Sequence, residues 1–203
     1  MNTSVEPGSF QQMRVRVLVR CWNFLGQSNK TLQVWDDATA QWPQWDWATE
    51  NRAFALAQNG RAQEAADTLH GLVQRSPQRA SAWFNLGFLL QQQADPVRLD
   101  GLRADAALEQ ATVLDARNDR AWYGLGLERV TQGRLDEAVV CFKHCTRLQP
   151  MSPYAWYQLA RVHHARGEME SAGQILAHLK TFDPKISNQL QRELATPAAG
   201  QPA

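Results

Sequence analysis

Residues 122–126 read Trp-Tyr-Gly-Leu-Gly, and residues 156–160, which follow at a spacing of 34, read Trp-Tyr-Gln-Leu-Ala. Residues 83–87 (Trp-Phe-Asn-Leu-Gly) carry the same motif 39 positions before residue 122, so one unit contains five extra residues. A fixed period of this length is typical of a protein built from repeated supersecondary units. The chain is therefore expected to be an array of such units.

Each unit has the pattern of two amphipathic helices joined by a tight turn. Apolar residues recur at steps of three and four, as in Leu69, Leu72 and Val73, which predicts a buried stripe along a helix. A glycine in the middle of the unit can take the left-handed backbone conformation that ends a helix. Small residues stand where two helix backbones must approach closely. The turn glycines are Gly26, Gly60, Gly133 and Gly167, and the small residues are Gly87, Gly126, Ala160, Ala104, Ala138 and Ala172.

The unit at 119–152 contains the fullest set of motif residues. They are Trp122, Leu125, Gly126, Gly133, Ala138, Phe142 and Pro150. This set resembles the tetratricopeptide repeat family, whose pattern is Trp-x2-Leu-Gly-x2-Tyr, then Ala-x3-Phe, then Pro. The resemblance implies an all-α fold, an α-solenoid of about five helix-turn-helix units with a C-terminal capping helix. It also implies that the consensus tryptophans Trp83, Trp122 and Trp156 belong to the core.

The period divides the chain into segments. Residues 1–11 are expected to be a disordered N-terminus, 12–45 a degenerate helix pair, 46–186 four repeat units, 187–195 a capping helix and 196–203 a disordered tail. The four units are 46–79, 80–118, 119–152 and 153–186. Segment 12–45 could instead be a non-repeat amphipathic helix followed by a tryptophan-rich linker. The extra residues of unit 80–118 predict a longer loop within 91–101, which is either a tolerated surface insertion or a contact loop.

Composition excludes several classes of protein. Lys and Arg number 21 against 20 Asp and Glu, so the chain lacks the cationic excess of a nucleic-acid-coating protein, and no nucleic-acid partner is expected. Three cysteines are too few for a disulfide framework, and no signal peptide or membrane span is recognised. We expect a cytoplasmic protein without a cofactor.

The family resemblance implies that the first helix of each unit lines a concave binding face. Seven aromatic residues fall on that face, and such residues are enriched at binding hot spots. The predicted groove residues are Arg16, Arg20, Trp47, Asn51, Phe54, Phe84, Asn85, Phe88, Arg120, Tyr123, Leu127, Tyr154, Tyr157, Gln158 and Arg161.

These residues predict a non-catalytic adaptor or assembly factor that binds an apolar or aromatic peptide segment of another protein, with the arginines favouring acidic flanks. Asn51, Asn85 and Gln158 share one repeat position and could pair with a peptide backbone, although each could equally be a solvated polar residue. A clamp for chaperone C-termini, known in some family members, is not expected, because Glu50 and Phe54 stand where that clamp needs Lys and Asn.

Other functions have weaker signals. Cys141, His144 and Cys145 could hold a metal, but buried thiols explain them as well, and we expect neither a metal site nor an enzyme. The alternative to the adaptor is a membrane-surface or self-assembling scaffold that uses the basic, apolar segment 13–25. Packing against the unit at 46–79 explains the same apolar residues, so a membrane partner is not expected. Homo-oligomerisation through a solenoid end or through the cluster of Trp35, Trp42 and Trp45 is a further alternative.

Overall fold

The structure is a computed structural model that describes residues 6–92, 99 and 101–195. The predicted tail at 196–203 and most of the predicted loop at 91–101 lie outside the described residues. The described residues form helices and turns and contain no strand. The predicted all-α class is therefore confirmed.

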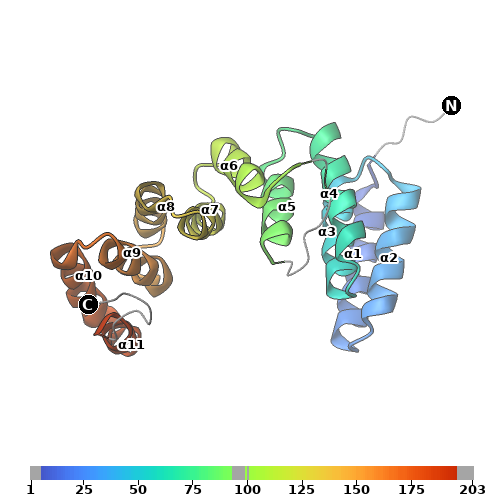
Figure 1. The fold of residues 1–203 in the computed structure, drawn as a ribbon. Helices are drawn as coiled ribbons and strands as arrows, with labels where there is room; N and C mark the ends of the chain where they lie inside the picture. The colour runs from blue at the N-terminus through green and yellow to red at the C-terminus, as the bar shows by residue number, and fades with distance from the viewer. Residues whose placement is uncertain (1–5, 93–98, 100, 196–203) are drawn as a thin grey trace. The chain divides into compact units, whose positions relative to one another are not determined.

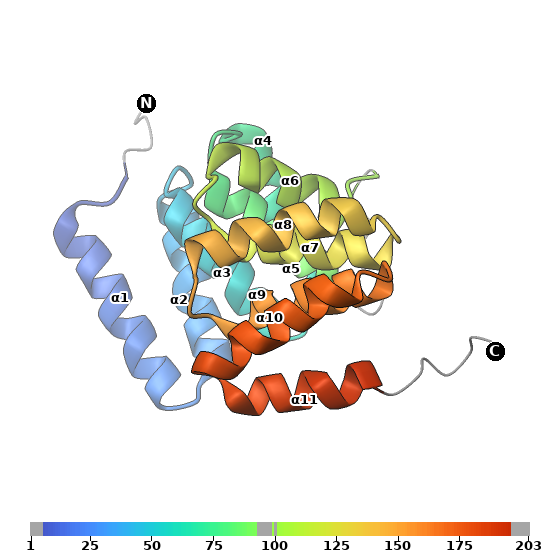
Figure 2. The same ribbon diagram turned by 90° about the vertical axis from the view of Figure 1, so that its left-hand side faces the viewer.

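The helices fall into two compact units, residues 1–114 and 115–203, and within each unit consecutive helices pack against one another (Figure 1). The helices of the first unit are α1 (Ser9–Phe24), α2 (Ser28–Gln41), α3 (Asp46–Gln58), α4 (Ala62–Arg75), α5 (Ala80–Gln92) and α6 (Ala104–Leu114). Those of the second unit are α7 (Asp119–Thr131), α8 (Leu135–Leu148), α9 (Pro153–Ala165), α10 (Met169–Phe182) and α11 (Pro184–Ala195). Figure 2 shows α11 alongside α10, against which it packs.

Two helix ends differ from the expected boundaries. The N-terminus was expected to be disordered through residue 11, but α1 begins at Ser9, because the Gln12 amide donates to the Gly8 carbonyl at 3.0 Å. The last helix begins at Pro184 rather than at 187, because the Asp183 carboxylate accepts a hydrogen bond from the Ile186 amide at 3.0 Å and caps the helix. The helices α3, α5, α7 and α9 begin at residues 46, 80, 119 and 153.

The turns inside the repeat units are built as the glycines predict. The backbone φ angles of Gly60, Gly133 and Gly167 are 74°, 72° and 77°. The residue after each glycine donates its amide to a carbonyl five residues earlier, as in the 2.8 Å bond from Arg134 to Arg129. This bond closes a Schellman turn, in which a side chain at the glycine position would be strained.

Small residues let the paired helices approach closely. A methyl group built on Gly87 would lie 2.7 Å from the Leu108 side chain, and one built on Gly126 would lie 2.7 Å from the Phe142 ring. Leu108 and Phe142 are fully buried. The second-helix side chain therefore occupies the space that a β-carbon on the first helix would need.

The consensus tryptophans are half-buried, although the family resemblance implied core positions for them. The indole N–H of Trp83 donates to the Pro77 carbonyl at 2.9 Å. Trp122 and Trp156 make the same bond, at 3.0 Å to Ala116 and 2.8 Å to Pro150. Each ring thus ties the start of a first helix to the turn before it.

The core of the first unit contains a different set of indoles. Trp35 and Trp45 are each 3% exposed, and both rings pack against Trp47, with centroids 5.3 and 5.4 Å away. Trp42 meets Trp45 edge to face at 6.1 Å. Trp35 and Trp45 lie inside the unit, so only the half-buried Trp42 of this cluster has surface to offer to a second copy.

Candidate functional site

A groove of about 550 Å³ lies on the first unit between α3 and α5. Five of the predicted residues line it, namely Trp47, Asn51, Phe54, Asn85 and Phe88. The other lining residues are Glu50, Ala53, Ala57, Gln58, Leu69, Leu89 and Gln92. Sequence reasoning missed Leu69, which belongs to a second helix, because its position in the repeat indicates only a buried stripe.

The groove has apolar walls. Phe54 on α3 and Phe88 on α5 are 63% and 48% exposed, so each ring offers a large face to solvent. Phe84 lies outside the lining but stacks on Phe88, with ring centroids 5.9 Å apart. Buried side chains of Leu69 and Leu89 also contribute to the lining. The arrangement offers two exposed aromatic rings beside an aliphatic surface.

The polar residues of the groove are partly engaged by their own helices. The Asn51 side-chain amide donates to the Trp47 carbonyl at 2.7 Å, so a donor that could serve a peptide backbone is used internally. The Glu50 carboxylate accepts from Ser81 at 2.7 Å and pairs with Arg79. The groove's one carboxylate is therefore neutralised.

Two predicted arginines lie on α1 rather than in the groove. The Arg16 guanidinium sits over the Trp47 ring, 4.6 Å from its centroid. Such cation–π stacking holds a positive charge in place at a defined distance from the ring. Because Trp47 lines the groove, Arg16 adds positive charge beside it, while Arg20 is exposed one turn further along the helix.

The remaining predicted residues form a separate surface on α7 and α9 of the second unit. The Gln158 amide donates to the Tyr123 hydroxyl at 3.4 Å, and Leu127 packs against the core of this unit. Tyr154 and Arg120 are exposed. The fifteen predicted residues are thus divided between two units, with eight in the first and seven in the second.

One residue of this second surface is held by the capping helix. The Tyr157 hydroxyl donates to the Glu193 carboxylate on α11, and Arg161 lies 5.8 Å from the Tyr157 ring centroid. Burial raises the pKa of Tyr157, and the bond to Glu193 raises it further. The same bond lowers the pKa of Glu193, so the pair is a neutral phenol and a carboxylate at neutral pH.

The candidate Cys–His–Cys cluster is built into helix packing. Cys141 and Cys145 are buried, and the His144 ring stacks on Trp122 at a centroid distance of 4.2 Å. Burial raises the pKa of Cys145 to about 12 and lowers that of His144. Within residues 6–92, 99 and 101–195, no group of three His, Cys, Asp or Glu side chains is arranged to hold a metal ion.

These environments predict selective thiol chemistry. Only the thiolate attacks iodoacetamide, so Cys145 is expected to be unreactive at neutral pH in the folded chain, as is buried Cys141, whereas exposed Cys21 reacts. Mass spectrometry should find one adduct on the folded chain and three in urea, since the chain has three cysteines. The variant Cys21→Ser should give no adduct when folded, and labelling of Cys145 as fast as Cys21 would contradict the burial described.

No helix in the described part of the chain is long and apolar enough to cross a bilayer.

Comparison with known proteins agrees with this geometry. Two family models, both described as tetratricopeptide repeat, match residues 129–194 and 100–142. No curated protein sequence matches the chain.

Similar solved structures cover most of the chain. MamA from Desulfovibrio magneticus RS-1 is 17% identical, with a TM-score of 0.68 over 93% of this chain and 99% of that one. YrrB, described as a TPR protein with an unusual peptide-binding site, is 16% identical, with a TM-score of 0.66 over 86% and 88%. Pseudomonas aeruginosa PilF is 15% identical, with a TM-score of 0.71 over 88% and 80%.

At these identities the solved structures establish the fold, and the two family models establish the repeat. The helix pairs with their Schellman turns, the close glycine contacts and the recurring indole bonds are the structural expression of that repeat. Tetratricopeptide repeats therefore occupy residues 100–194, and over most of its length the chain has the fold of solved structures that include a tetratricopeptide repeat protein.

Proposed function

We propose that the chain is a non-catalytic adaptor or assembly factor that binds a peptide segment of another protein in the groove between α3 and α5. The observation that carries this proposal is the pair of exposed rings, Phe54 and Phe88, that line the 550 Å³ groove. Large apolar side chains exposed together in a concavity are typical of binding sites, because their exposure to water is unfavourable unless a partner covers them.

The groove's chemistry favours an apolar or aromatic segment with acidic flanks. The two phenylalanine rings suit apolar side chains, and the Asn85 amide can pair with a peptide backbone. Arg16 and Arg20 on α1 contribute positive charge, while Arg79 neutralises Glu50. An acidic flank would therefore meet attraction rather than repulsion.

The surface on α7 and α9 would make further contacts with the same partner or another one. Tyr154, Arg120 and Arg161 are its exposed members. Tyr123 and Gln158 are hydrogen-bonded to each other, Tyr157 is bonded to α11, and Arg161 lies beside the Tyr157 ring. We assign this surface a secondary role, because its polar ends are already hydrogen-bonded within the unit.

The family and its structural neighbours support an interaction module. Stacked helix-pair repeats generally present extended binding surfaces, and the structurally similar YrrB is described as having a peptide-binding site. None of the three cysteines forms a disulfide, which fits a reducing compartment such as the cytoplasm.

The test uses fluorescein-labelled peptides with two phenylalanines and acidic, neutral or basic flanks. Fluorescence anisotropy should show binding that is strongest for the acidic-flanked peptide. The double variant Phe54→Ala/Phe88→Ala should lose about 30-fold or more in affinity, since a hot-spot truncation costs about 2 kcal/mol.

The matched control is Val113→Ala, an apolar residue of the same unit that is 73% exposed and lies outside the groove. It should bind the peptides as the unchanged chain does, and both variants should keep the far-ultraviolet circular dichroism of the original. Undiminished affinity in the folded double variant would show that the groove is not the binding site.

A further inference from the structure

The first helix has a second apolar stripe, on the side away from its packing partner. Phe10, Met13, Val17, Cys21 and Phe24 follow one another at steps of three and four, which places them on one face of α1. All five are exposed, and the exposed fraction of Phe24 reaches 90%. We call these five residues the α1 ridge.

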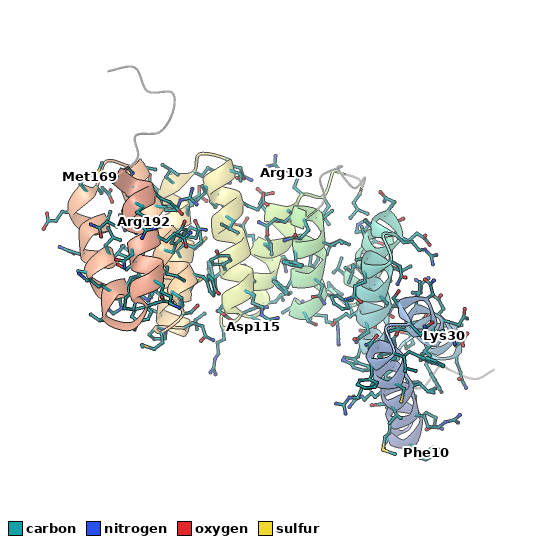
Figure 3. All side chains as sticks on the ribbon, turned by 90° about the horizontal axis from the view of Figure 1, so that it is seen from below. Phe10, Lys30, Arg103, Asp115, Met169 and Arg192 are labelled. Atoms are coloured by element: carbon teal, nitrogen blue, oxygen red, sulfur yellow. The ribbon has the colours of Figure 1, made fainter. Side chains whose placement is uncertain are left out.

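The opposite face of α1 accounts for its packing. Val15 is buried, Val19 and Trp22 are half-buried, and α2 is the main packing partner of the helix. Figure 2 shows α2 beside α1, and Figure 3 labels Phe10 near the N-terminal end of α1. One apolar face of α1 therefore packs in the fold, and the α1 ridge on the opposite face stays exposed to solvent.

The ridge is flanked by positive charge on both sides. On a helical projection Arg14 borders it on one side, and Arg16 and Arg20 border it on the other. From residue 7 to residue 35 the chain has four basic residues and no acidic one, which leaves 17 basic against 20 acidic elsewhere. The net charge of the whole chain conceals this asymmetry.

We propose that the α1 ridge docks on the surface of an anionic lipid bilayer. The helix would lie in the interface, with the ridge side chains at the boundary between headgroups and acyl chains. Arg14 and Arg20 have long aliphatic stems that reach outward from the two edges of the ridge, where lipid phosphates would neutralise them. Apolar insertion and charge attraction thus act on the same face.

Charge favours this occupant over a second copy of the chain. Helices that pair through an apolar seam are matched by opposite charges along its edges, but the only charged side chains of α1 are arginines. Pairing two copies would place arginines against arginines. Anionic lipid headgroups supply the missing negative charge.

The ridge lies outside the peptide groove. None of its five residues lines that groove, which α3, α4 and α5 form. The chain could therefore hold a peptide partner at a membrane, and membrane binding can be tested without any peptide. The two proposals fail separately.

The test is flotation of the full chain with vesicles of phosphatidylcholine, with and without phosphatidylglycerol. The chain should float only with the phosphatidylglycerol vesicles, and binding should weaken as salt is raised. Arg14→Gln/Arg20→Gln should lower the partition coefficient by about 25-fold, at about fivefold for each arginine. Phe10→Ala/Phe24→Ala should lower it by about tenfold or more.

Val113→Ala, exposed on α6, is the apolar control and should float as the unchanged chain does. Circular dichroism checks that each variant is folded. Absence of flotation, equal flotation with pure phosphatidylcholine, or binding that survives both double variants would overturn the proposal. A dimer in light scattering that Phe10→Ala/Phe24→Ala dissolves, without vesicle binding, would also overturn it and assign the ridge to a second copy.

Discussion

Replacing Trp35 with alanine is expected to destabilise the first unit by about 3–5 kcal/mol, the range for truncating a large buried aromatic side chain. Trp35 is 3% exposed, and its ring meets the Trp47 ring edge to face at 5.3 Å. Its removal leaves a cavity between α2 and α3 and deprives Trp47 of one of its two indole neighbours. Urea unfolding followed by far-ultraviolet circular dichroism and tryptophan fluorescence measures the loss.

Phe24→Ala is the matched control, because that ring belongs to the same unit but is 90% exposed. Its free energy of unfolding should lie within about 0.5 kcal/mol of the unchanged chain. Equal effects from the two substitutions would mean that the indole cluster does not hold α2 on α3.

Gly126→Ala is expected to destabilise the second unit by about 1–3 kcal/mol, the usual cost of overpacking a core. The added methyl group would lie 2.7 Å from the fully buried Phe142 ring, so the ring or the helix backbone would have to shift. Gly173→Ala in α10 should instead stabilise the unit by about 0.5–1 kcal/mol, since nothing lies within 4 Å of a methyl group there and alanine favours the helix. The two substitutions should shift the urea midpoint in opposite directions.

A double-mutant cycle tests whether the contact with Phe142 causes the destabilisation by Gly126→Ala. Phe142→Leu shortens the side chain that the new methyl group would meet, so Gly126→Ala should cost less in that background than in the unchanged chain. Additive effects would show that the cost of Gly126→Ala arises elsewhere.

Sequence alone predicts the helix pairs because their determinants are local. A glycine with positive φ is required wherever the Schellman turn occurs, so Gly60, Gly133 and Gly167 mark the turns directly. The small residue at Gly126 is likewise dictated by one neighbouring ring, that of Phe142. Such requirements recur with the period and can be recognised without coordinates.

Contacts that do not repeat could not be predicted in this way. The bond between Tyr157 and Glu193 joins side chains 36 residues apart, in a last repeat and a capping helix that have no counterpart elsewhere. Trp35 takes the aromatic position of its unit, as Phe142 does in unit 119–152, but Trp45 and Trp47 have no consensus counterpart. Spacing therefore did not show that these three indoles pack together. Helix α1 has apolar residues on two faces, and periodicity cannot tell which of them packs.

In the candidate groove, too, some features follow from the repeat positions and others depend on contacts that do not repeat. The shared position in each first helix brings Asn51 and Asn85 to one lining, together with Phe54 and Phe88. The internal bond of Asn51 and the stacking of Arg16 on Trp47 depend on side-chain conformations that a pattern of residue types does not contain. Their role in peptide binding stays a prediction for the anisotropy measurement.

The indole bonds give the repeat a direction. The segment 119–152 reaches backward with its own N–H, from Trp122 to Ala116, and at its other end offers the Pro150 carbonyl to Trp156. Each repeat thus has an indole donor at its start and a carbonyl acceptor at its end. The same bond can therefore join any number of repeats in a row. The series ends where Leu190 occupies the next tryptophan position, since an aliphatic side chain has no hydrogen to donate.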